Sequence, residues 1–567
     1  MTSDLISYRT LVEALDAAPA DSVFVAEWHD DDDRENITFG EFRRRARMQA
    51  AFLQQHGARS GDRVVLILPQ GIPLMTAFAG AMMLGVVPAI LAYPNSKVEP
   101  AKYRSGLAGL TANLQAHLIV IDENFPHELL EHIAADQDTK LVKSPRLNEK
   151  GRQFVADNSS ILPDQLAFIQ HSGGTTGLQK GVALSHRAIL SQIRNLATVL
   201  DIRATEDRLY SWLPLYHDMG LIACFMLPMV CHLPVVMQSP SEWVMRPSTM
   251  LQLCSEYRCT LAWLPNFTFQ FVARRTPQNI STRYDLSSLR ALINCSEPVS
   301  VKSMNEFYET FSSHGLKKSA LHTSYAMAEN VFAVTQSGPK GPAQIFADGL
   351  RFRSEKIIEQ ASPTQAGAIA LTSSGRLLPN NRARIVSETG DTLPDGSVGE
   401  IVIQSDSLFN GYFHRPDLTS IALLHGWYHT GDLGFFLDGE LFVVGRKKDL
   451  LIVGGENIYP QDLEEIVSTH SAIHDGRVVA LGIFNRDLGT EDIAIVAEVE
   501  NEKFLSENNR IEREIRASVF SILGVAVRFL FLKPPKWIVK STAGKPARSA
   551  TREKLLREHP ELLTRDF

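Results

Sequence analysis

Cysteine is scarce in this chain, and its scarcity excludes two classes of protein. Only five cysteines occur, an odd number, and no two stand at the Cys-x-x-Cys spacing of zinc sites and redox motifs. A disulfide framework and a structural zinc site are therefore not expected. The same usage favours a reducing compartment, and we expect a cytoplasmic protein.

An excess of positive charge is also missing. The 57 Lys and Arg residues are outnumbered by 64 Asp and Glu residues, which gives a net charge of −7 at pH 7. Nucleic acid is therefore not expected as the main partner. We find no internal repeat and no low-complexity segment, and the first residues lack the basic start and apolar run of a signal peptide.

No long apolar run is left uninterrupted. The most apolar stretch, residues 72–93, contains Gly80, Gly85 and Pro88. It could be taken for a membrane span, but its breakers favour a buried helix over 73–84 that turns into a strand over 86–92. No transmembrane segment is therefore expected.

Alternating strand and helix signals indicate the fold class. Apolar strand patterns occur at residues 23–28, 64–69 and 118–121, and an amphipathic helix pattern covers residues 39–56. Such alternation predicts an α/β fold with largely parallel or mixed sheets covered by helices. Residues 396–404 alternate like a strand after a turn, which indicates a small β subdomain.

The length of 567 residues exceeds what one core organises, so two or three domains are expected. A boundary is predicted near residues 445–449. The segment after it has its own helix pattern at 461–469 and strand patterns at 478–481 and 493–498, which suits one small α+β domain.

A glycine-rich run is the most informative motif. Residues 171–182 read His-Ser-Gly-Gly-Thr-Thr-Gly-Leu-Gln-Lys-Gly-Val, a loop rich in backbone and hydroxyl donors with one cation, Lys180. A strand over 165–170 precedes it, and a helix with Ser185 as N-cap follows. Strand, loop and helix predict a site for an oligophosphate, although the order of residues is not that of the Walker motif.

Two further segments suit a nucleotide. Tyr325-Ala-Met-Ala-Glu329 offers a ring to stack on a purine and a carboxylate for a phosphate-bound metal, although the same spacing occurs on ordinary helices. Residues 428–434 predict a turn that presents Asp432 to a ribose diol, with a plain Asx turn as the alternative.

The last two segments supply positive charge. Residues 445–460 place Arg446 and Lys448 before an apolar strand and a Gly-Gly pair, as in a hinge followed by an open loop. Residues 540–545 form a small flexible turn that delivers Lys545. A cation near an α-phosphate stabilises the charge that develops there, whereas the plain alternative is a solvated surface lysine.

In this order and at this spacing, the five segments resemble the adenylate-forming superfamily. That superfamily comprises acyl-CoA synthetases, luciferases, nonribosomal-peptide adenylation domains and fatty acyl-AMP ligases, and the resemblance covers roughly residues 10–560. It implies a large N-terminal adenylation domain (1–445), a small mobile C-terminal domain (446–567), and ATP with Mg²⁺ between them.

The resemblance also implies roles for individual residues. Lys545, Lys180 and Glu329 would be catalytic, Lys448 would lie at the hinge, and Glu329 with Thr176 would bind the metal. The nucleotide would contact Ser172, Gly173, Gly174, Thr175, Thr176, Gly177, Lys180, Ser324, Tyr325, Ala326, Asp432 and Arg446. The order of residues at Gly173, and Ala326 where glycine is common, depart from the usual pattern.

Several stretches resemble the fatty acyl-AMP ligase branch. They are Trp212 to Ile222, Pro265 to Phe267, Asn294 to Pro298, and Gln461-Asp462. The 56 positions from Glu329 to Ile385 (385 − 329) fit an insertion that in those ligases contacts the small domain and discourages use of CoA. Residues 454–460 instead resemble a CoA-synthetase loop.

We therefore expect an ATP-dependent, AMP-forming ligase that loads a fatty or related carboxylic acid onto an acyl carrier protein. Transfer to CoA is the first alternative, and a non-catalytic nucleotide-binding protein is the second. An apolar acid pocket is expected from Leu215, His217, Met219, Trp263, Phe267 and Met327. Each of these side chains could instead belong to the core, and His217 could contact an aromatic or polar acid or cap a helix.

Overall fold

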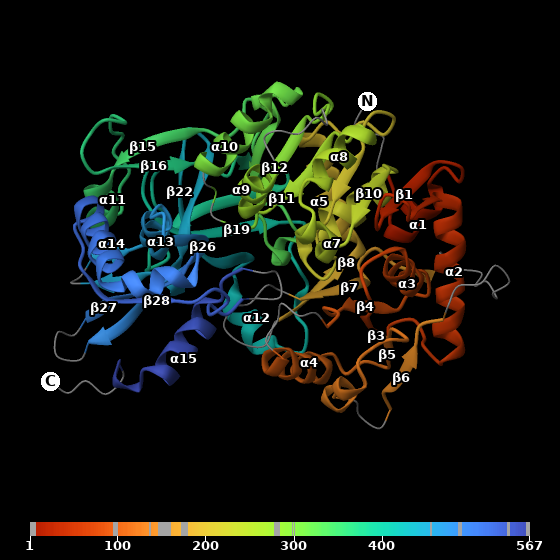
Figure 1. Ribbon diagram of the computed structural model, residues 1–567. Helices are drawn as coiled ribbons and strands as arrows, with labels where there is room; N and C mark the ends of the chain where they lie inside the picture. Colours follow the sequence, from red (N-terminus) through yellow and green to blue (C-terminus); the bar gives the residue numbers. More distant parts are fainter. Residues whose placement is uncertain are drawn as a thin grey trace.

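The computed structural model describes most of the chain (Figure 1). The described residues are 7–94, 100–134, 138–145, 160–171, 180–276, 284–297, 299, 301–453, 456–485, 490–540 and 545–562. The predicted residues 172–177 of the glycine loop lie outside them.

A seven-stranded sheet forms the centre of the N-terminal part. Its strands are parallel except for β2, which pairs antiparallel with β1 at the edge. In spatial order they are β13 (Leu321–Ser324), β12 (Ala291–Cys295), β11 (Leu261–Leu264), β9 (Leu209–Ser211), β10 (Val235–Gln238), β1 (Val23–Trp28) and β2 (Arg34–Thr38). The inner strands are buried along their length, as expected for parallel strands covered on both faces.

A second sheet is entirely parallel. Its order is β4 (Val87–Ile90), β3 (Arg63–Ile67), β5 (Leu118–Ile121) and β6 (Lys140–Lys143). Between β3 and β4 the chain forms α3 (Ile72–Met83), in which every residue but Pro73 is buried. The prediction of a buried helix followed by a strand is confirmed. Within the described residues, no helix is long and apolar enough to span a bilayer.

Antiparallel sheets follow in the chain. A three-stranded sheet has the order β20 (Gly411–Tyr412), β8 (Gly181–Ser185) and β7 (Leu166–His171). A five-stranded sheet contains β18 (Asn381–Val386), β19 (Gly399–Ser405), β22 (Trp427–Leu437), β21 (Leu423–Leu424) and β23 (Glu440–Arg446). The latter is the predicted small β subdomain. Shorter pairs join β14 (Thr335–Gln336) to β17 (Arg376–Leu377) and β15 (Gln344–Asp348) to β16 (Ala368–Thr372).

The last part of the chain has its own sheet. Long strands β26 (Ile473–Asn485) and β27 (Thr490–Val499) pair antiparallel, and β28 (Val527–Lys533) adds parallel to β27. A two-stranded ribbon of β24 (Leu451–Val453) and β25 (Glu456–Ile458) precedes them. The predicted strands at 478–481 and 493–498 lie inside these longer strands.

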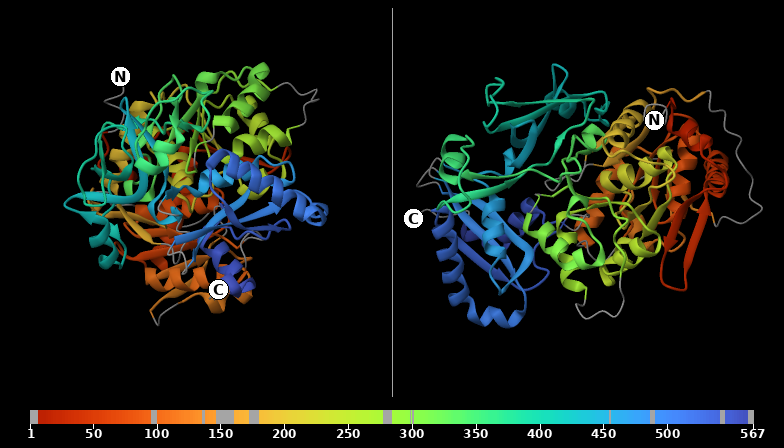
Figure 2. Two further views of the ribbon diagram at one scale, coloured as in Figure 1. Left: turned by 90° about the vertical axis from the view of Figure 1, so that its left-hand side faces the viewer. Right: turned by 90° about the horizontal axis from the view of Figure 1, so that it is seen from above.

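Helices cover the sheets. Figures 1 and 2 show the C-terminal segment (blue) at the opposite end of the molecule from the first two helices (red). The helices are α1 (Leu11–Ala17), α2 (Phe39–Gln55), α3, α4 (Pro100–Leu114), α5 (His186–Val199), the π-helix η3 (Met219–Met226), α6 (Leu227–Cys231), α7 (Pro240–Met245), α8 (Thr249–Glu256), α9 (Asn266–Arg275), α10 (Val301–Phe311), α11 (Gly349–Glu355), α12 (Pro416–Ala422), α13 (Pro460–Ser468), α14 (Asn508–Leu523) and α15 (Arg548–Glu558).

The hydrophobic core is divided along the chain. One large cluster of buried side chains runs from Leu11 to Leu441. Two others consist only of residues from Leu451 onward, one on each side of the β26–β27–β28 sheet. A smaller cluster joins Phe352, Phe435 and Phe442 to Tyr459 and so spans both parts.

Candidate functional site

The secondary-structure elements that flank the glycine loop differ from the prediction. The preceding strand is β7, and Ser185 caps α5 by accepting a hydrogen bond from the Ala188 N–H, as predicted. A second strand, β8, lies between loop and helix and pairs antiparallel with β7. The predicted succession of strand, loop and helix is therefore wrong. The loop joins two strands of a hairpin, because residues 181–185 are a buried apolar run that pairs with both neighbours.

Lys180 emerges from this hairpin beside Tyr412. Its Nζ lies 4.3 Å from the centroid of the Tyr412 ring. The Tyr412 hydroxyl donates to Glu329 Oε1 (2.8 Å) and lies 3.2 Å from the hydroxyl of Tyr428. Strand β20 brings Tyr412 here by pairing with Val182 of β8. A cation and a carboxylate predicted from separate motifs thus share one aromatic neighbour.

Tyr325 and Asp432 meet directly. The Tyr325 hydroxyl donates to Asp432 Oδ2 (2.6 Å), and Arg446 Nε lies 3.4 Å from Asp432 Oδ1. Burial raises the pKa of Asp432, and the charge of Arg446 opposes that rise. The sequence predicted a turn over residues 428–434. The structure shows instead that they belong to the long strand β22, which pairs with β19 on one side and β23 on the other.

The strand is irregular where the carboxylate sits. The pairing of β22 with β19 shifts register between Glu400 and Val402, and Gly431 adopts a left-handed φ of 71°. The Thr430 hydroxyl accepts a hydrogen bond from the Asp432 N–H (3.0 Å). A bulge of this kind re-aims a side chain within a sheet, which explains how a strand presents Asp432 to the site.

Lys545 reaches the N-terminal part of the molecule. Its ammonium donates a hydrogen bond to the backbone carbonyl of Ser296. It is therefore not the solvated tail lysine of the plain alternative. Burial together with the Lys545 charge lowers the pKa of His217 to about 3, so the imidazole is neutral at physiological pH.

His217 begins a tightly packed turn into η3. Asp218 caps this helix by accepting a hydrogen bond from the Met219 N–H (2.8 Å). Gly220 follows, where a Cβ atom would lie 2.2 Å from the Pro214 carbonyl oxygen. His217 Nε2 is buried and has no hydrogen-bond partner among the described residues. His217 therefore does not cap the helix; its neighbour does.

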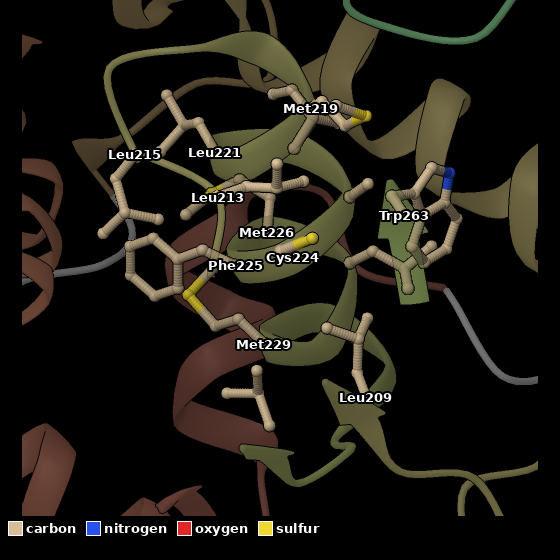
Figure 3. Close-up of a cluster of buried hydrophobic side chains, with 14 of the residues drawn as sticks. Leu209, Leu213, Leu215, Met219, Leu221, Cys224, Phe225, Met226, Met229 and Trp263 are labelled. Atoms are coloured by element: carbon tan, nitrogen blue, oxygen red, sulfur yellow. The ribbon is translucent and has the colours of Figure 1, made fainter. Parts of the chain in front are cut away.

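The residues predicted for the acid pocket fall into two groups. Leu215, Met219 and Trp263 are buried around η3 (Figure 3). Phe267 is 37% exposed and packs edge-on against the stacked rings of Trp212 and Trp243. Burial alone does not separate core side chains from acid-binding ones, so the pocket stays a prediction.

The other predicted residues lie near these groups. Ser324 is buried and its hydroxyl donates to the Thr335 carbonyl (2.7 Å), while Ala326 forms an isolated bridge with Ala333. Met327, next along the chain, is partly buried against the main core.

Lys448 lies in the short 3-10 turn η7 (Lys447–Asp449), where the chain passes from β23 to β24. Burial and the neighbouring charges of Arg446 and Lys180 lower the pKa of Lys448.

Sequence reasoning missed Tyr412 and the role of Asp218. Tyr412 follows an unremarkable Asn-Gly dipeptide, and only the pairing of β20 with β8 brings it to Glu329. Asp218 lies in the stretch from Trp212 to Ile222, but the sequence did not reveal that it caps η3.

The segment between Glu329 and Ile385 contacts the C-terminal part. It contains β15, α11 and β16, and Phe352 of α11 stacks on Tyr459 with ring centroids 5.0 Å apart. Arg353, buried on the same helix, opposes through its charge the rise that burial causes in the pKa of Asp462 on α13. An insertion that touches the small domain was expected for the fatty acyl-AMP ligase branch.

Comparison with known proteins identifies the family. The family model of the AMP-binding enzymes matches residues 12–413. The chain belongs to the AMP-binding enzyme family. This AMP-binding enzyme is 30% identical to a 4-hydroxyphenylalkanoate adenylyltransferase of Mycobacterium bovis, over 92% of this chain and 86% of the relative. It is 31% identical to the long-chain-fatty-acid–AMP ligase FadD32 of Mycolicibacterium smegmatis, over 91% and 88% of the two chains.

A solved structure shares the same fold. It comes from a study of fatty acyl-adenylate ligases from E. coli and L. pneumophila, with a TM-score of 0.88, 27% identity and 98% of both chains covered. The predicted α/β fold is thereby confirmed over nearly the whole AMP-binding enzyme, and so is the resemblance to the adenylate-forming superfamily.

Proposed function

We propose that this enzyme activates a fatty or related carboxylic acid with ATP as an acyl adenylate and passes the acyl group to an acyl carrier protein. The observation that carries the proposal is the gathering of cations around a few carboxylates. Lys180 shares Tyr412 with Glu329, Arg446 pairs with Asp432, and Lys545 enters the same region from the far end of the chain.

This gathering suits a reaction between two anions. A carboxylate attacks the α-phosphate of ATP and expels pyrophosphate, so the barrier falls mainly through charge neutralisation and alignment. Lys180, with the loop from Ser172 to Gly177, would bind phosphate oxygens, and Lys545 would approach the α-phosphate. Tyr325 would flank the adenine, while Asp432 with Arg446 would hold the ribose.

Glu329 fits a magnesium ion held jointly with phosphates. One of its oxygens accepts from Tyr412, and among the described residues no three His, Cys, Asp or Glu side chains gather to form a metal site of their own. A metal here would therefore need phosphate oxygens to complete its shell, with Thr176 as a further ligand. Mg²⁺ would supply charge neutralisation on those phosphates.

We place a hinge at Lys448, between a large domain of residues 1–445 and a small domain of residues 446–567. The division of the buried clusters near Leu451 supports this boundary. In the arrangement seen, Lys545 contacts the Ser296 carbonyl of the N-terminal part, which suits adenylate formation. Turning the small domain about the hinge would withdraw Lys545 and admit the acceptor thiol.

A carrier protein rather than CoA is favoured as the acceptor by the contact of α11 with Tyr459. That contact ties the insertion to the small domain and so limits which thiols reach the adenylate. The relatives named for AMP ligation support the same choice. The acid would lie along His217, Met219, Trp263, Phe267 and Met327. Five buried, unpaired cysteines suit the reducing cytoplasm.

The test is pyrophosphate exchange over a panel of carboxylic acids, followed by transfer to a phosphopantetheinyl carrier protein or to CoA. We expect exchange with medium or long acyl chains and acyl transfer to the carrier. The Lys545→Ala variant should keep ATP binding and lose most adenylate formation. Rapid acyl-CoA formation would reject the carrier protein as acceptor, and no exchange with any acid would reject the ligase.

A further inference from the structure

The Lys545 ammonium contacts a residue, Ser296, whose backbone conformation is unusual. Ser296, whose carbonyl accepts from the Lys545 ammonium, has a φ of 70°, a left-handed conformation that non-glycine residues adopt at a cost. The conformation turns this carbonyl out of the direction set by β12, which ends at Cys295. Strain of this kind persists where the surrounding structure holds it and is concentrated at functional sites.

Asp218 is linked to Ser296 through Met219. The Ser296 hydroxyl contacts Met219 Sδ (3.9 Å), and the Met219 N–H donates to Asp218 Oδ1 (2.8 Å). Burial and the charge of Glu329 raise the pKa of Asp218, whereas the Met219 N–H and the charge of Lys545 oppose that rise. The Asp218 carboxylate and the Lys545 ammonium therefore attract each other in poorly solvated surroundings.

We propose that Asp218 is a positioning residue, which together with the Ser296 carbonyl docks the Lys545 ammonium for adenylate formation. An ammonium has three N–H donors. One is given to Ser296, and the other two remain for the phosphate or the acid, while the Asp218 carboxylate attracts the ammonium without a direct hydrogen bond. The inference rests on the proposed function for its role in catalysis, but the docking itself is a property of this chain.

The neighbours of Lys545 support a docking site for one cation. His217 is neutral, because its pKa lies at about 3, and burial raises the pKa of the Cys295 thiol to about 12. Neither side chain therefore carries a charge at neutral pH. Asp218 supplies negative charge in this neighbourhood, and withdrawal of the small domain would take Lys545 away from both Asp218 and the Ser296 carbonyl.

Asp218→Asn is a mild way to test the dock. Asparagine caps a helix about as well as aspartate, so the start of η3 is preserved while the charge is lost. The matched control is Asp475→Asn, which removes the ion pair with Arg274 (2.9 Å), another charged contact between the two parts of the chain. Asp218→Glu keeps the charge and serves as the conservative variant.

We expect Asp218→Asn to slow pyrophosphate exchange about 10-fold, because the attraction between two charges in poorly solvated surroundings is lost. Acyl transfer from added acyl adenylate should change less than about twofold, because Lys545 is withdrawn in that step. Asp218→Glu should recover part of the exchange rate, and Asp475→Asn should leave it unchanged. Combining Asp218→Asn with Lys545→Ala should cost no more than Lys545→Ala alone.

A second measurement needs no catalysis. Competitive acetylation with acetic anhydride, read by mass spectrometry, compares the reactivity of Lys545 with that of exposed Lys340 in the protein without nucleotide. Lys545 should be protected in the parent and in Asp475→Asn, and more reactive in Asp218→Asn. If Lys545 labelling and pyrophosphate exchange are the same in Asp218→Asn and the parent, Asp218 does not position Lys545. Changed labelling without exchange on any acid would uphold the dock and reject the ligase.

Discussion

At the scale of single residues, Tyr412 links two charges that the sequence left apart. Its hydroxyl holds Glu329, and its ring lies beneath Lys180. The two interactions use different parts of one side chain, so substitutions can separate them. The hydroxyl fixes a carboxylate by a hydrogen bond, and the ring attracts an ammonium by its quadrupole.

Tyr412→Phe should weaken the binding of magnesium and leave the binding of ATP phosphates unchanged. Loss of the hydroxyl frees Glu329, so the Mg²⁺ concentration for half-maximal pyrophosphate exchange should rise about 5- to 20-fold, the scale of a lost charge-assisted hydrogen bond. Tyr412→Leu removes the ring as well and should in addition raise the KM for ATP. Identical magnesium titrations for Tyr412→Phe and the parent would contradict this assignment.

Tyr325 makes a comparable bond to Asp432 on the nucleotide side. Tyr325→Phe keeps the ring that would flank the adenine and removes the hydroxyl 2.6 Å from Asp432 Oδ2. The carboxylate then loses its hydrogen bond from Tyr325 and keeps its contact with Arg446. The dissociation constant for AMP should rise about 10-fold, with little change in the thermal midpoint, as measured by calorimetric titration and by unfolding. Unaltered AMP binding would remove the Tyr325–Asp432 pair from the nucleotide site.

At the scale of elements, the sequence predicted the helices and strands that depend on local patterns, but not the strand pairing that depends on distant residues. The helix at 39–56, the strand at 23–28 and the cap at Ser185 depend on apolar periodicity and side-chain chemistry within a few residues. The hairpin of β7 and β8 and the irregular stretch of β22 depend on partners far along the chain. The hairpin was therefore predicted as a loop that enters a helix, and the irregular stretch of β22 was predicted as a turn.

The same division holds for the candidate site. The motifs carrying Lys180, Tyr325, Glu329 and Asp432 were visible in the sequence, because glycine and carboxylate chemistry is local. Their convergence on Tyr412 was not visible, since β20 joins β8 across more than two hundred residues.

Helix α11 should restrain the small domain through one ring. Phe352 is 2% exposed and stacks on Tyr459. Phe352→Ala should loosen this contact and raise CoA-dependent thioester formation several-fold, while pyrophosphate exchange stays within about twofold of the parent. Burial makes the change costly, about 3 to 5 kcal/mol, so Phe352→Leu provides a milder variant. Exposed Leu350 on the same helix gives the control, Leu350→Ala. Unchanged CoA use in both Phe352 variants would contradict the restraint.

Asp462 should make the stability of the molecule depend on pH. Burial raises the pKa of Asp462 to about 7, and Oδ2 is covered without a hydrogen-bond partner among the described residues. The folded state therefore holds this proton more tightly than the unfolded state. As the pH rises from about 4 to about 7, the free energy of unfolding should fall by about 3 kcal/mol, because the unfolded state loses this proton first.

Asp462→Asn cannot lose this proton, so its stability should fall less over that range, and it should be the more stable protein at pH 8. Denaturant unfolding at pH 5, 6, 7 and 8 measures the difference. Exposed Asp395, replaced in the same way, is the control and should follow the parent. Parallel curves for Asp462→Asn and the parent would show that the carboxylate is solvated.

At the scale of the whole molecule, two parts with largely separate cores meet through one small apolar cluster around Phe352 and Tyr459 and through a few charged contacts. Arg274 of α9 pairs with Asp475 of β26 (2.9 Å), and Lys545 reaches Ser296. A large apolar interface would resist rearrangement, whereas one small apolar cluster and a few polar contacts resist it less. The arrangement is therefore suited to a molecule that alternates between two positions of its C-terminal part.

Fixing that arrangement should separate the two half-reactions. Arg274→Cys with Asp475→Cys introduces two thiols at the contact, and the five native cysteines are buried, so a short bismaleimide should react mainly with the introduced pair. Cross-linked enzyme should still form pyrophosphate and acyl adenylate, because Lys545 is held in place. Transfer to the carrier protein should fall at least tenfold, because the small domain can no longer turn. The same double variant without cross-linker should carry out both steps, and undiminished transfer after complete cross-linking would mean that no such rotation is needed.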